Sequence, residues 1–136
     1  MNVPGLVAEH VWSWWALLLM LGGAWPMVRY ATSRTWPRSI WPTLAVKGSV
    51  LMVGPVAGFL LGGSWGFALP ALAAHAVVVV IVNTAAELVM LRRAFKARLS
   101  LSTVLSMGAL NAAVIGSATL VVATSEVYER IRSSLG

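Results

Sequence analysis

The amino-acid sequence predicts an all-α membrane protein, a single domain over residues 1–136 that crosses the bilayer with four helices. Three observations lead to this prediction. Of the 136 residues, 59% are hydrophobic and only 10% are charged, which is far from the composition of a soluble domain. The chain has no cysteine, which excludes a disulfide scaffold and thiolate metal sites. The charged residues also leave uncharged runs long enough to cross ~30 Å of hydrocarbon at ~1.5 Å per residue.

These runs define the four predicted spans in order. Between His10 and Arg29 lie 18 residues without a formal charge, which predicts a first span at about 8–28. The 39 residues 48–86 suffice for two helices, and the glycines at 62–66 with Pro70 predict a tight turn between spans at about 46–63 and 68–91. The 27 residues 99–125 predict a fourth span at about 100–124.

The positions of the lysines and arginines predict the orientation, because cationic loops remain on the cytoplasmic side. They gather in the first and third connections, as Arg29, Arg34, Arg38 and Lys47, and as Arg92, Arg93, Lys96 and Arg98. Both termini are therefore expected on the non-cytoplasmic side of a multi-pass protein in a bacterial cytoplasmic (inner) membrane. The net charge of +6 is then explained by topology and anionic lipid, so we expect no nucleic-acid partner.

Tryptophans mark the predicted membrane interfaces, where an indole keeps its N–H in water and its ring in lipid. On the outer side these are Trp12, Trp14, Trp15 and Trp65. On the inner side, each proline of Trp36-Pro37 and Trp41-Pro42 disfavours helix at the residue before it. We therefore expect the segment 35–43 to be an extended strap lying along the interface.

Small residues at four-residue spacing predict where helices approach closely. They are Gly54, Gly58 and Gly62 in the second span, and Gly108, Ala112 and Gly116 in the fourth. The sequence leaves open whether these two ridges pack on each other or on another subunit. Pro55 lies inside the first ridge and is expected to weaken or kink that helix.

Four polar residues at membrane depth form the candidate functional site: His75, Asn83, Glu87 and Asn111. The first three lie at spacings of eight and four and thus share one face of the third span. Such groups face protein or water rather than lipid. Glu87 lies near the inner surface, so we expect it to reach the interface or to pair with an arginine, and we expect His75 and Asn111 to form hydrogen bonds in helix packing. Asn83 and Asn111 are candidates to meet across the bundle.

Two cofactor interpretations follow from the titratable residues. His10 and His75 both lie toward the outer face and are candidate axial ligands of haem b, as in membrane four-helix cytochromes. Otherwise we expect no cofactor and no metal, because no ligand spacing or phosphate-binding glycine loop is present. No general base stands beside a candidate nucleophile, so we expect no enzymatic activity.

The sequence therefore predicts a small non-catalytic membrane subunit, in contact with lipid, that packs against a larger complex or against copies of itself and stabilises or positions it. One alternative is a proton or solute permease, whose transport path follows the polar stripe on the third span. Another is a haem-binding membrane anchor.

Overall fold

A computed structural model of the chain describes residues 13–62 and 69–135, and within them leaves out the side chains of 52–62, 69, 71, 126–128 and 131. Every regular element in these ranges is a helix. The helices are α2 (Trp14–Thr32), α3 (Trp36–Gly62), α4 (Leu69–Ala94), α5 (Leu101–Ala123) and α6 (Glu126–Leu135). The all-α class is thus confirmed. Helix α6 is an addition, because the last helix predicted from the sequence ends at about residue 124.

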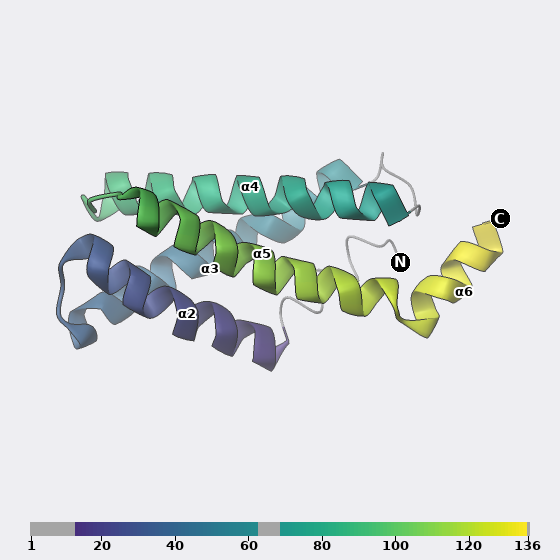
Figure 1. Ribbon diagram of the computed structural model, residues 1–136, viewed down its shortest axis with the longest axis horizontal. Helices are drawn as coiled ribbons and strands as arrows, with labels where there is room; N and C mark the ends of the chain where they lie inside the picture. Colours follow the sequence, from purple (N-terminus) through teal and green to yellow (C-terminus); the bar gives the residue numbers. More distant parts are fainter. Residues whose placement is uncertain (1–12, 63–68, 136) are drawn as a thin grey trace.

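The four long helices form a bundle in which each packs against its sequence neighbours, and α5 closes the arrangement against α2 (Figure 1). The α2–α3 and α4–α5 connections lie at the same end, which we call the basic end, and α6 projects from the opposite end (Figure 1). At the basic end, the backbone N–H of Arg98 donates to the carbonyl of Ala31 at 3.0 Å. The two basic connections therefore share one end, as their charge predicted.

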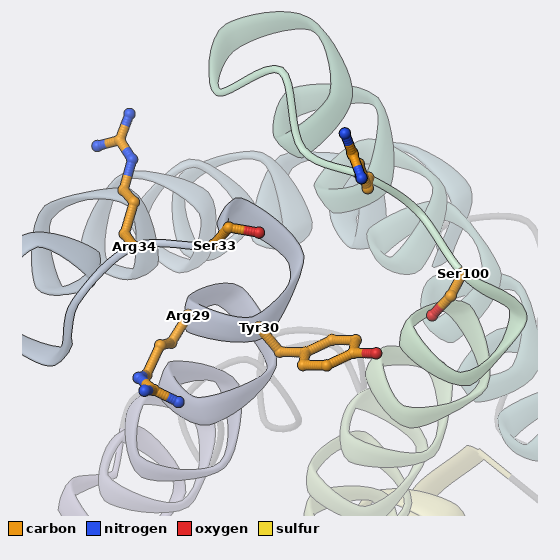
Figure 2. Close-up of a pocket in the computed structure, with 6 residues that line it drawn as sticks. Arg29, Tyr30, Ser33, Arg34 and Ser100 are labelled. Atoms are coloured by element: carbon orange, nitrogen blue, oxygen red, sulfur yellow. The ribbon is translucent and has the colours of Figure 1, made fainter.

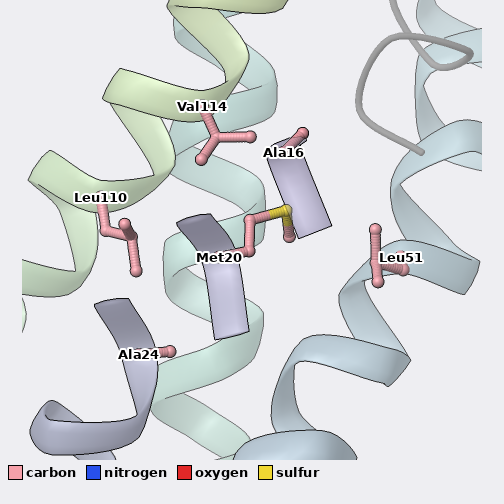
Figure 3. Close-up of a cluster of buried hydrophobic side chains, with 6 residues drawn as sticks. All are labelled: Ala16, Met20, Ala24, Leu51, Leu110 and Val114. Carbon is pink, nitrogen blue, oxygen red and sulfur yellow. The ribbon is translucent and has the colours of Figure 1, made fainter. Parts of the chain in front are cut away.

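In the described part of the chain the core contains two apolar clusters, one on either side of the bundle's middle. Toward the end opposite the basic end, which we call the far end, the cluster in Figure 3 consists of Ala16, Met20, Ala24, Leu51, Leu110 and Val114. Toward the basic end, a second cluster consists of Val28, Ala31, Val46, Leu91, Ala97 and Met107. The buried residues of α2 recur every three or four positions and are mostly alanine, so one face of this helix approaches α3 and α5 closely.

Helix α3 contradicts the extended strap expected over 35–43. It begins at Trp36, ten residues before the predicted span. Pro37 lies in the first turn, where a proline is tolerated because the amide N–H has no partner there. The first turns are also held by side chains, since Ser39 Oγ donates to the Trp36 carbonyl at 2.8 Å and Thr43 Oγ1 donates to the Ser39 carbonyl at 2.8 Å. Pro42 is buried and so packs within the fold rather than ending the helix.

Within the described residues, two helical segments are long and apolar enough to cross a membrane, Leu72–Ala94 of α4 and Leu101–Ala123, which is α5. The bounds of α4 and α5 lie within three residues of the spans predicted at 68–91 and 100–124. By length and composition, these two helices are compatible with a membrane.

Candidate functional site

Lys47 occupies the centre of the bundle and not the first connection, where its charge had placed it. It lies on α3 with its side chain fully buried. Its Nζ atom is 2.6 Å from Oε1 of Glu87 on α4, and it also donates to Oδ1 of Asn111 on α5 at 2.9 Å. The expectation that Glu87 reaches the surface or pairs with an arginine is therefore wrong, because its partner is a lysine from another helix.

Asn111 completes the arrangement by bonding in three directions. Its amide nitrogen donates to Oε2 of Glu87 and to Oγ1 of Thr84, each at 3.0 Å, while its amide oxygen accepts from Lys47. Lys47, Glu87, Asn111 and Thr84 thus form what we call the buried polar network, which joins α3, α4 and α5. Both carboxylate oxygens of Glu87 and both ends of the Asn111 amide have partners.

The buried polar network lies well inside the helices. At ~1.5 Å per residue, Glu87 is about 10 Å from the end of α4 and Lys47 about 16 Å from the start of α3. Its members are at most 9% exposed, and Lys47 and Glu87 are not exposed at all. The two apolar clusters bracket it along the bundle. A buried ion in such a place is tolerated because an opposite charge and hydrogen bonds satisfy it.

The rest of the predicted polar stripe also turns inward. His75 is 6% exposed and Asn83 is 9% exposed, so α4 directs His75, Asn83 and Glu87 to the interior. Asn111 bonds to Thr84 and Glu87 rather than forming the proposed contact with Asn83. His10 lies outside the described residues, as do Trp12 and Trp65, so the structure does not test the histidine pair suggested as haem ligands. No group of three or more potential metal-binding side chains occurs in the part of the chain that is described.

The two small-residue ridges have different outcomes. Gly54, Gly58 and Gly62 all lie in α3, in the stretch whose side chains are outside the description. On α5, Gly108 is half-buried against Thr84, but Ala112 and Gly116 are exposed. A Cβ added to Gly116 would meet nothing within 4 Å. These two α5 positions therefore do not pack against the described part of the chain.

The residue that sequence reasoning missed is Lys47, together with Thr84. A signal was present: Lys47 stands between apolar and small residues on both sides, and Glu87 needed a cation at its depth. The geometry of the buried polar network is suited to fixing the register of α3, α4 and α5 relative to one another. Each side-chain nitrogen and oxygen of Lys47, Glu87 and Asn111 has a partner within the buried polar network.

Similarity to known proteins gives no guide to this arrangement. No known protein family, no curated protein and no solved structure matches the chain.

Proposed function

We propose that this protein is a small non-catalytic subunit of a bacterial cytoplasmic membrane, with four spans and both termini outside. It packs against a larger membrane complex or against copies of itself. The observation that carries the proposal is that each side-chain nitrogen and oxygen of Lys47, Glu87 and Asn111 bonds within the buried polar network. Charged groups that are paired in this way stabilise the register of the helices, and they contribute little to substrate binding.

The outer surface supports the second part of the proposal. Along one face of α5 the exposed residues include Ala109, Ala112 and Gly116, which would let another helix approach its backbone closely. The exposed positions of α4 are larger and apolar, among them Val77, Ile81 and Val89. We assign the α4 face to lipid and the α5 face to a partner.

The double variant Ala112→Leu/Gly116→Leu tests this assignment. Both positions are exposed, and Gly116 has free space around it, so the chain itself should fold normally. The matched control is Ile81→Phe on the lipid-assigned face. We expect the double variant, purified in mild detergent, to lose the homo-oligomer or the stoichiometric partner that wild type and control retain. A wild type that is monomeric and alone after native-membrane extraction would contradict the proposal.

A proton or solute permease is the second candidate, because His75, Asn83 and Glu87 all turn to the bundle interior. It is tested by proton flux into liposomes that contain wild type or Glu87→Gln. Flux in wild type above that of protein-free liposomes, lost in the variant, would establish the permease. Under the subunit proposal, both proteins match the protein-free liposomes.

A further inference from the structure

A pocket of about 420 Å³ opens at the basic end, between the end of α2 and the start of α5 (Figure 2). Its lining is formed by Arg29, Tyr30, Ser33, Arg34, Arg98 and Ser100. In Figure 2 the Tyr30 ring extends from α2 toward Ser100, while the side chain of Arg34 turns outward at the rim. The lining residues thus include three arginines and three residues with hydroxyl groups, and none of them carries a carboxylate.

The charge around this pocket is not balanced by the described part of the chain. Of the four glutamates, Glu87 is used by Lys47 inside the bundle, and Glu126 and Glu129 belong to α6 at the opposite end (Figure 1). Glu9 lies outside the described residues. The basic end, by contrast, also carries further exposed cations: Arg38, Arg92, Arg93 and Lys96. This excess of positive charge favours an anion.

The pocket is built on a fixed framework. The Arg29 guanidinium lies 4.5 Å from the centre of the Trp36 ring, and that of Arg34 lies 5.6 Å from the Phe95 ring. The Nε atom of Arg29 is buried and has no hydrogen-bond partner among the described residues. Ser100 caps α5 by accepting from the Thr103 N–H at 3.1 Å, which holds the N-terminus of this helix beside the pocket. A helix N-terminus and guanidinium groups both favour phosphate.

From this geometry we propose that the pocket binds a phosphate group. Arginine recognises phosphate through paired N–H donors, and Tyr30, Ser33 and Ser100 offer further hydroxyl donors. Two sources present this chemistry: the phosphodiester headgroup of an anionic lipid and free inorganic phosphate. The lipid source rests on the proposed membrane placement, since basic pockets at the ends of membrane helices bind anionic headgroups. The free-phosphate source does not depend on it.

The test compares two triple variants that remove the same charge from the same end. The pocket variant is Arg29→Gln/Arg34→Gln/Arg98→Gln, and the control is Arg38→Gln/Arg92→Gln/Arg93→Gln, whose residues are exposed and do not line the pocket. The purified full chain in neutral detergent is titrated with phosphatidylglycerol, phosphatidylcholine and, at constant ionic strength, inorganic phosphate, with native mass spectrometry as the readout. Circular dichroism checks helicity.

We expect wild type and control to bind phosphatidylglycerol at least tenfold more tightly than phosphatidylcholine, and the pocket variant to lose this preference. Preference for phosphatidylglycerol without binding of inorganic phosphate identifies the lipid source, whereas binding of inorganic phosphate alone, lost in the pocket variant, identifies the free anion. Equal losses in both triple variants, or no binding of either phosphate probe to wild type, would overturn the proposal. If the pocket variant fails to fold, Arg98→Gln against Arg92→Gln makes the same comparison. These outcomes are independent of the oligomer test on α5.

Discussion

Lys47 and Glu87 are 40 residues apart in the chain, yet their charged atoms meet at 2.6 Å with both side chains fully buried. The pair joins α3 to α4, and Asn111 joins both residues to α5. Removing two ions from water is costly, so such a pair contributes little to stability compared with apolar residues of the same size. Its consequence lies in specificity, because any other register of the three helices would leave a buried charge without its partner.

Removing one member of the Lys47–Glu87 pair should therefore lower the free energy of unfolding more than replacing both members does. We expect Lys47→Met to lower the free energy of unfolding by about 3 kcal/mol, because it leaves the Glu87 carboxylate uncompensated. The double variant Lys47→Met/Glu87→Gln should recover most of this loss, since the introduced amide keeps hydrogen-bonding capacity toward Asn111 without the charge. Unfolding in mixed detergent micelles measures both values. Lys96→Met, an exposed lysine at the basic end, is the control. Additive losses in the double variant would contradict a coupled pair.

Asn111 should matter more than its position in an apolar helix suggests. Asn111→Leu removes an acceptor from Lys47 and donors from Glu87 and Thr84, which leaves several buried polar atoms unsatisfied. We expect a loss of about 2 to 3 kcal/mol in the same unfolding measurement. Two positions along the helix, Ala113 is exposed, so Ala113→Leu adds the same side chain without touching the network. If both variants are equally stable, Asn111 is not a structural member of the network.

The sequence predicted the bounds of α4 and α5 to within three residues, and it misplaced the start of α3. Local rules explain both results. The bounds of α5 follow from a charge-free run, and those of α4 from the turn residues before it and the two arginines at its end, whereas two prolines and a lysine in 36–47 each indicate a break when considered alone. In the fold, Pro37 lies in a first turn, and Lys47 is neutralised by a residue far along the chain.

For the site, sequence reasoning predicted four polar residues that face protein or water, and all four are buried in the fold: His75, Asn83, Glu87 and Asn111. It did not predict which residues of other helices these side chains contact. Helical spacing relates residues within one helix, but the partner of Glu87 depends on how α3 and α4 are aligned. That alignment is a tertiary property.

Two adjacent glycines of α2 should respond in opposite ways to alanine. A Cβ at Gly23 would lie 2.7 Å from Cδ1 of Leu110, a residue of the far-end apolar cluster, whereas a Cβ at Gly22 would meet nothing within 4 Å. We expect Gly23→Ala to cost about 1 to 3 kcal/mol through overpacking, and Gly22→Ala to be neutral or stabilising by up to about 1 kcal/mol through helix propensity. Thermal unfolding in detergent distinguishes them. Adding Leu110→Ala to Gly23→Ala should abolish the clash, so the effects of these two substitutions should not add.

The sidedness of the two ends can be tested with single cysteines, because the natural chain contains none. Ser33 and Lys96 lie at the basic end and Ser133 lies on α6, and all three are exposed. In the proposed topology, positive charge retains the basic end in the cytoplasm. In intact cells we therefore expect a membrane-impermeant maleimide to label Ser133→Cys and to leave Ser33→Cys and Lys96→Cys unmodified.

Permeabilised cells should allow all three to react, which controls for accessibility. Labelling of Ser33→Cys and Lys96→Cys in intact cells, with Ser133→Cys protected, would reverse the orientation. Labelling of only one of the two basic-end positions would contradict the arrangement that brings Arg98 to Ala31.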